Sequence, residues 1–204
     1  MIRRAVLLLV AMATALVVVG GVAYALTFTC DDPGDQPGDQ NPALGTCWGT
    51  EVSDNITGTS RADVIHAKAA NDIVDAQGGN DSVRGGGEID EVHGSDGDDV
   101  LSGDGANEPS RDMQDDIYGE GGNDTLDGEG GVNSYFGDIG ADTIDAAFSK
   151  LDGPNAAAGE IISGGPGNDT IYAKDGLSDT VNCGPGKDRV KSHDASDAIA
   201  SDCE

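Results

Sequence analysis

The residues of this chain that could do chemistry are aspartates that recur every nine positions. Six of them follow one another at this interval: Asp54, Asp63, Asp72, Asp81, Asp90 and Asp99. An aliphatic residue stands two positions after each one, as Ile65 does after Asp63. A column of carboxylates at fixed spacing offers charged oxygen ligands, and the chemistry that it favours is the binding of metal ions.

The nine-residue period also indicates which elements bring these aspartates into register. It predicts a coil in which each unit supplies one strand and one turn, with the aliphatic residue inside and the aspartate on the turn. Polar residues flank the aliphatic ones, as in Ser82-Val83-Arg84, which is typical of a strand with one buried face. Two units per turn would stack parallel strands about 4.8 Å apart. We therefore expect an all-β fold, a β-solenoid with 18-residue turns.

The best turns are rich in glycine. They read Gly-Ser-Asp-Gly-Asp-Asp at 94–99, Gly-Glu-Gly-Gly-Asn-Asp at 119–124 and Gly-Gly-Pro-Gly-Asn-Asp at 164–169. These turns are similar to the G-G-x-G-x-D-x-U-x nonapeptide of the haemolysin-type calcium-binding (RTX) repeat family. The resemblance covers roughly residues 50–200. It implies a parallel β-roll that holds several calcium ions between successive turns, and it says little about biological role.

The chemistry of these turns suits calcium. Glycine lets the backbone adopt positive φ and direct its carbonyls toward one point, while an aspartate adds charged oxygens. A site needs two good loops one turn apart, so the strongest pairs are Asp81 with Asp99 and Asp124 with Asp142. The next pair is Asp169 with Asp188. Each of these aspartates has a glycine two positions before it, and the glycines are Gly79, Gly97, Gly122, Gly140, Gly167 and Gly186.

Three early loops have another residue in that glycine position: Arg61, Ala70 and Glu88. A non-glycine residue there costs about 1 kcal/mol if the turn is left-handed. Asp63, Asp72 and Asp90 therefore remain metal candidates with less favourable loops, and the alternative is that their turns are structural only.

Composition supports a cation-binding fold and excludes several classes of partner. The chain has 38 acidic and 11 basic residues and a net charge of −27 at pH 7. Such a surface repels nucleic acid and anionic lipid headgroups, so we expect no nucleic-acid partner and no membrane contact beyond an export signal. The 32 glycines and 4% aromatic residues leave little bulk for a wide core, which favours one thin, elongated domain.

Stacking adds an electrostatic requirement. Carboxylates about 5 Å apart repel each other by roughly 0.8 kcal/mol at the dielectric constant of water and by about 3 kcal/mol at an effective value of 20. The few basic residues cannot neutralise such a column. We therefore expect divalent cations to make the fold stable.

The first 25 residues have the pattern of an export signal. Met1-Ile2-Arg3-Arg4 is basic, residues 5–22 are apolar, and Ala23-Tyr24-Ala25 is an A-x-A cleavage site. This predicts a signal peptide over 1–25 and a secreted or surface-exposed chain that begins at Leu26. The apolar run is long for a signal, so an uncleaved membrane anchor stays an alternative.

Export would place the four cysteines where disulfides form. Four cysteines allow three connectivities, and we favour the local pairs Cys30–Cys47 and Cys183–Cys203, because each would close a loop at one end of the coil. The alternative is a zinc site. The expected organisation is an acidic Pro/Gly linker and N-terminal cap over 26–49, repeats over 50–182, and last repeats with a closed cap over 183–204. We interpret Trp48 as a hydrophobic lid on the open end of the coil, or alternatively as a ligand-stacking residue.

Residues 105–111 and 146–159 depart from the repeat. We expect the first segment to loop out of the coil and the second to be a bulged or looped coil. The first functional hypothesis is an exported, non-catalytic calcium-binding protein. The second is a surface adhesin or carbohydrate-binding module that uses the two off-pattern loops, although the sequence identifies neither a protein nor a glycan partner. An enzyme would have to place its catalytic group among the same loops, at Glu108, Arg111, Lys150 or Asp152.

Overall fold

A computed structural model describes residues 26–30, 46–104, 114–147 and 159–204. The export segment, most of the Pro/Gly linker, the core of both off-pattern segments and the four residues named for an enzyme lie outside the described residues. Within the described part of the chain, no helix is long and apolar enough to cross a membrane.

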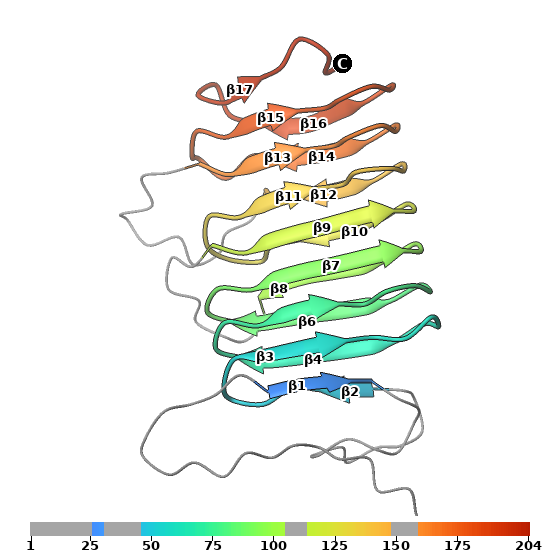
Figure 1. Ribbon diagram of the computed structural model, residues 1–204. Coiled ribbons are helices and arrows are strands. Elements are labelled where there is room, and N and C mark those ends of the chain that lie inside the picture. Colours follow the sequence, from blue (N-terminus) through green and yellow to red (C-terminus); the bar gives the residue numbers. More distant parts are fainter. Residues whose placement is uncertain (1–25, 31–45, 105–113, 148–158) are drawn as a thin grey trace, which may run out of the picture.

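The described strands form two parallel sheets (Figure 1). The nine-stranded sheet contains β1 (Leu26–Thr29), β3 (Asp54–Thr57), β5 (Ile73–Asp75), β7 (Glu91–Asp96), β9 (Asp116–Gly121), β11 (Ser134–Phe136), β13 (Ile161–Ser163), β15 (Thr180–Asn182) and β17 (Ala198–Ile199). The eight-stranded sheet contains β2 (Thr46–Trp48), β4 (Val64–Ala69), β6 (Ser82–Gly87), β8 (Val100–Asp104), β10 (Thr125–Asp127), β12 (Thr143–Asp145), β14 (Thr170–Ala173) and β16 (Arg189–His193).

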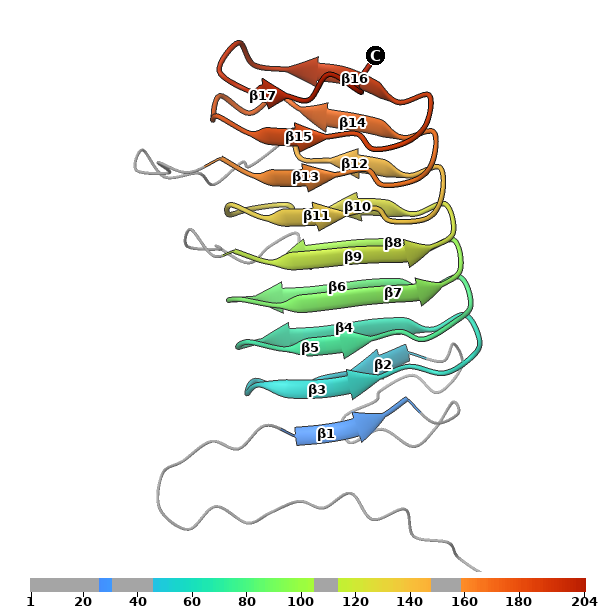
Figure 2. The ribbon, with the colours of Figure 1, turned by 45° about the horizontal axis from the view of Figure 1, so that its top comes forward.

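The chain alternates between the sheets, so it winds into a solenoid (Figure 2). In the regular part each turn takes 18 residues, as the pairing of Val74 with Val92 and of Val83 with Leu101 shows. The fold is therefore the all-β parallel β-roll that the nine-residue period predicts.

The core is one side chain deep. Most strands bury the aliphatic residue that stands two positions after the acidic residue of the repeat, and the set includes Ile56, Ile65, Val74, Val83, Val92, Leu101, Ile117, Leu126, Ile144, Ile162, Ile171 and Val181. Tyr135 takes this place in β11 and is equally buried. Full burial of one such aliphatic side chain contributes about 1.5–3 kcal/mol to the stability of the folded state. Because a strand supplies one such side chain, the core is continuous along the roll but thin.

The two long edges of the roll differ. The turns that lead from the nine-stranded to the eight-stranded sheet lie on the right-hand side of Figure 1, and we call this side the glycine edge. It carries the loops 76–81, 94–99, 119–124, 137–142, 164–169 and 183–188. The turns on the opposite edge lead back to the nine-stranded sheet. Both interruptions of the repeat belong to them, since they fall between β8 and β9 and between β12 and β13.

Both ends of the roll have a disulfide, and both bonds are the local pairs expected. Cys30 is bonded to Cys47 and Cys183 to Cys203. The first bond joins the residue after β1 to β2, and these strands pair with β3 and β4. The two sheets thus extend into the segment that we expected to be a cap.

The interpretation of Trp48 as a lid on the core is wrong. Cys47 occupies the inward position of β2, so the next side chain points to the outer face. There Trp48 stacks on His66, with ring centroids 4.4 Å apart. Strand alternation therefore places the tryptophan outside the coil.

Candidate metal centre

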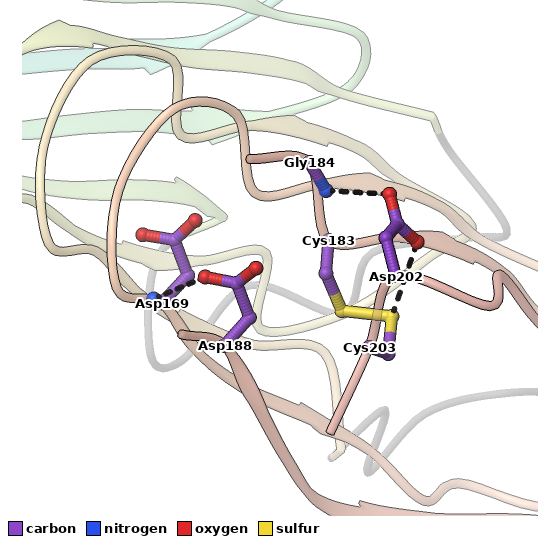
Figure 3. The surroundings of a disulfide bond; sticks show 6 residues. All are labelled: Asp169, Cys183, Gly184, Asp188, Asp202 and Cys203. Atoms are coloured by element: carbon purple, nitrogen blue, oxygen red, sulfur yellow. Dashed lines mark hydrogen bonds between the residues drawn. A yellow bond between two sulfur atoms is a disulfide. The ribbon is translucent and has the colours of Figure 1, made fainter. Parts of the chain in front are cut away.

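A ladder of buried aspartates runs along the glycine edge. The backbone N–H of Asp81 donates to Oδ1 of Asp99 at 2.7 Å, and that of Asp124 donates to Oδ1 of Asp142 at 2.9 Å. The same bond joins each neighbour in the series Asp63, Asp81, Asp99, Asp124, Asp142, Asp169 and Asp188. Figure 3 shows the last step, from Asp169 to Asp188, beside the Cys183–Cys203 disulfide. No member of the ladder is more than 7% exposed.

The ladder is continuous across both interruptions of the repeat. Asp99 is bonded to Asp124 although 25 residues separate them, and Asp142 to Asp169 although 27 do. The expectation that partners stand one regular turn apart was too narrow, because the extra residues enter on the opposite edge and leave the glycine edge stacked. The three expected pairs are parts of one column.

In all members of the ladder after Asp63, the second carboxylate oxygen has no hydrogen-bond partner. Oδ2 is buried and accepts no hydrogen bond in Asp81, Asp99, Asp124, Asp142, Asp169 and Asp188. A buried charged oxygen without a partner is costly, and proteins normally pair such groups or use them to coordinate metals. Six such atoms in one column therefore fit a row of cations.

Backbone carbonyls from the next turn approach the same points. A Cβ placed on Gly119 would lie 2.5 Å from Oδ2 of Asp124 and 2.8 Å from the carbonyl oxygen of Gly137. A Cβ on Gly137 would lie 2.6 Å from both Oδ2 of Asp142 and the carbonyl oxygen of Gly164. Oxygens of two successive turns thus converge where only glycine leaves space. An all-oxygen set of carboxylates and carbonyls is the donor set of hard cations such as calcium.

The glycine two positions before each aspartate is needed for close packing of the turns. A Cβ on Gly140 would lie 1.4 Å from the carbonyl oxygen of Gly122, and one on Gly186 would lie 1.6 Å from that of Gly167. Gly140, Gly167 and Gly186 do not have a left-handed backbone. Positive φ alone therefore does not explain them, and steric exclusion by the neighbouring turn does.

Asp63, the first aspartate of this ladder, and Asp54, an aspartate on the opposite edge, differ from the aspartates described above. Oδ2 of Asp63 accepts bonds from the N–H of Thr59 at 2.7 Å and from its hydroxyl at 3.0 Å. Thr50 does the same for Asp54. Because Thr59 and Thr50 already donate to these oxygens, the alternative that the turn of Asp63 is structural only is favoured at this position.

A second ladder runs along the opposite edge. It joins Asp54, Asp72, Asp90, Asp115 and Asn133, and after the interruption Glu160, Asp179 and Asp197. The candidates Asp72 and Asp90 lie in this ladder, apart from the other thirteen predicted metal residues. Their Oδ2 atoms also have no hydrogen-bond partner. Ala70 and Glu88 in their loops are left-handed, with φ of 76° each, which is the condition under which a non-glycine residue was expected to be costly there.

Asn133 occupies one position of this ladder, and both polar atoms of its side chain have hydrogen-bond partners without a cation. Its Oδ1 accepts from the N–H of Asp115 at 2.9 Å, as an aspartate would. Its Nδ2 donates to the carbonyl oxygen of Gly130 at 2.9 Å. The amide therefore satisfies both ends of the side chain. Among the described aspartates of the two ladders, Asp54 and Asp197 also accept hydrogen bonds at both carboxylate oxygens.

The buried aspartates are held in an environment that resists ionisation. Burial raises the pKa of Asp81 and of Asp124 to about 6 and that of Asp142 to about 7, while bonds from backbone N–H groups oppose the shift and neighbouring carboxylates add to it. On the opposite edge burial raises the pKa of Asp90 to about 9. The column therefore has to be neutralised by protons or by cations.

Asp115 and Asp179 were not among the metal residues predicted from the repeat. Both belong to the ladder of the opposite edge, and Oδ2 of each is buried without a hydrogen-bond partner. Each follows an irregularity in the repeat, so simple spacing did not connect them with Asp90 and Glu160.

Comparison with known families gives one result. A family model described as the RTX calcium-binding nonapeptide repeat matches the chain in four copies, over residues 48–83, 75–107, 112–144 and 157–190. The copies cover more than half of the chain and include every aspartate of the glycine-edge ladder. Neither the search of curated proteins nor the search of solved structures finds a match.

Proposed function

Because the chain belongs to the RTX calcium-binding nonapeptide repeat family, we propose that it is an exported, non-catalytic protein whose β-roll binds several calcium ions and is stabilised by them. The observation that carries this proposal is the row of six buried Oδ2 atoms without hydrogen-bond partners on the glycine edge. Calcium would supply positive charge between successive turns.

The residues that would hold the ions are Asp81, Asp99, Asp124, Asp142, Asp169 and Asp188. Each keeps Oδ1 engaged with the backbone of the preceding turn, which fixes the carboxylate and leaves Oδ2 for the ion. Carbonyl oxygens of the glycine loops converge with these atoms and complete the donor set. Held in this way, the ligands are preorganised by the fold.

Export is supported by two independent features. The first 25 residues have the order of a signal peptide, with a basic start, an apolar run and Ala23-Tyr24-Ala25. All four cysteines are paired in disulfides, which persist in oxidising compartments outside the cytosol.

Isothermal titration of the chain from Leu26 with calcium tests the binding. We expect several ions per chain with dissociation constants of about 10⁻⁴–10⁻³ M, the range of extracellular calcium modules. Magnesium should bind more weakly, since it prefers a smaller octahedral shell that keeps several waters. A chain that binds no calcium at millimolar concentrations would refute the proposal.

Terminal sequencing of the protein recovered from cells and from the medium tests export. We expect the main species to be outside the cells and to begin at Leu26. Protein found only inside the cells, with residues 1–25 intact, would contradict this part of the proposal.

A further inference from the structure

Three carboxylates gather on the opposite edge, outside the glycine loops. Glu160, Asp175 and Asp179 each offer an oxygen, and the three oxygens lie within 4.8 Å of one another. Glu160 directly precedes β13, while Asp175 and Asp179 belong to the turn between β14 and β15. The N–H of Glu160 donates to Oδ1 of Asp179 at 2.9 Å, so the cluster joins two successive turns of the roll.

This cluster does not follow the nonapeptide pattern. The turn that ends in Asp179 reads Lys-Asp-Gly-Leu-Ser-Asp over 174–179, with Leu177 where the glycine edge has its packed glycine. The extra ligand is Asp175, whose Oδ1 accepts a bond from the N–H of Leu177 at 2.8 Å. Its own turn therefore orients this carboxylate.

Two buried oxygens of the cluster, one in Asp175 and one in Asp179, have no hydrogen-bond donor. Asp179 is 1% exposed, and its Oδ2 has no partner, since the bond from Glu160 uses Oδ1. Oδ2 of Asp175 is likewise buried and without a hydrogen-bond partner. No basic side chain of the described residues forms an ion pair with Asp175 or Asp179. Buried carboxylates in this state need a positive charge.

We propose that Glu160, Asp175 and Asp179 form a separate calcium site on the opposite edge. Calcium binds oxygen at 2.3–2.6 Å, so two ligands of one ion can stand up to about 5 Å apart, and the spacing of the cluster meets this limit. Glu160 contributes to the site directly before β13, the first strand after the interruption of the repeat. An ion there would link the start of β13 to the turn between β14 and β15.

The substitution Asp175→Asn tests this site with little structural change. Asparagine keeps the Oδ1 that accepts from Leu177 and removes only the charge. Asp127→Asn is a matched control, because Asp127 ends strand β10 at the opposite edge, is partly buried and accepts a bond at Oδ1 from the N–H of Glu129 at 2.9 Å. Asp127 is not part of the cluster.

Equilibrium dialysis at saturating calcium is the measurement. We expect Asp175→Asn to bind one ion fewer per chain and Asp127→Asn to bind as many as the unmodified chain. If Asp175→Asn binds the full number, this inference is overturned and the glycine-edge sites are unaffected. If the unmodified chain binds no calcium, this site and the proposed function both fail.

A second measurement needs no variant, so it remains decisive if Asp175→Asn does not fold. Crystals of the chain grown in calcium should give an anomalous peak among the carboxylates of Glu160, Asp175 and Asp179. Peaks along the glycine edge with none in this cluster would overturn the inference.

Discussion

At the scale of single residues, each ladder aspartate uses its two oxygens differently. Oδ1 binds the backbone of the preceding turn, while Oδ2 is buried without a donor in the rungs from Asp81 to Asp188 on the glycine edge. Asn133 fills both roles with an amide. The charge of the aspartates is thus unnecessary for turn stacking, and we attribute it to cation binding.

Asp124→Asn should separate these two roles. The amide oxygen can still accept from Asp99, so the turn should form, but the rung loses an anionic ligand. When free calcium is at ten times the dissociation constant, one bound ion adds about 1.4 kcal/mol to the free energy of unfolding. We therefore expect the calcium-dependent part of that free energy to fall by about 1.4–3 kcal/mol in this variant. Denaturation in calcium and in chelator measures this part.

The control for this variant is Asp116→Asn, which removes a charge in the adjacent strand β9 outside the ladder. Its calcium-dependent stability should be that of the unmodified chain. An unchanged calcium increment in Asp124→Asn would show that this carboxylate holds no ion.

The raised pKa values predict that acid stabilises the calcium-free roll. Burial raises the pKa of Asp81, Asp124 and Asp142 to about 6–7, above the ordinary value of 3.8. Protonation of these groups favours the folded state, and its contribution is complete below the unfolded pKa and is lost as pH rises through the folded values. In chelator, the melting temperature should therefore be higher near pH 5 than near pH 8.

Thermal unfolding followed by circular dichroism checks this dependence. In millimolar calcium the trend should weaken or reverse, because ions and protons compete for the same oxygens. A calcium-free chain that melts at higher temperature near pH 8 would contradict the description of these carboxylates as buried and unneutralised.

At the scale of elements, the glycine edge depends on the close approach of its turns. Gly140→Ala should destabilise the roll by about 3 kcal/mol or more, because the new Cβ would overlap the carbonyl oxygen of Gly122. Gly176→Ala is the matched control. Gly176 is left-handed, with φ of 98°, but nothing lies within 4 Å of an added Cβ, so the cost should be only about 1–2 kcal/mol.

Urea denaturation in calcium gives both values. Equal costs for the two variants would mean that backbone conformation, and not contact between turns, explains the glycines of the repeat.

The sequence predicted much at this scale. The aliphatic residue two positions after each aspartate identified the buried face, and the nine-residue period gave the parallel register that pairs Val83 with Leu101. The links from Asp99 to Asp124 and from Asp142 to Asp169 were missed. Counting residues treats an insertion as a break in the whole coil, whereas an insertion on one edge leaves the other edge stacked.

Other features of the site depend on contacts that the repeat does not encode. Thr59 completes the hydrogen bonding of Oδ2 of Asp63 by two bonds, which the spacing of the aspartates does not predict. Asp175 meets Glu160 and Asp179 only because the turn between β14 and β15 folds its carboxylate toward them. Such convergence is set by three-dimensional packing and has no fixed spacing.

At the scale of the whole molecule, two acidic ladders flank a core that is one side chain deep. Disulfides join the strands at both ends, but they do not neutralise the carboxylates between them. The chain carries a net charge of −27, so the cations that we propose would supply the charge that the sequence lacks. We expect calcium to be a structural component of the fold.

The most direct test is the far-ultraviolet circular dichroism of the chain from Leu26, with its disulfides intact, at neutral pH in calcium and in excess chelator. We predict a β spectrum with a cooperative melting transition in calcium, loss of both in chelator, and recovery when calcium is restored. The same β spectrum and the same melting temperature in chelator as in calcium would contradict the account.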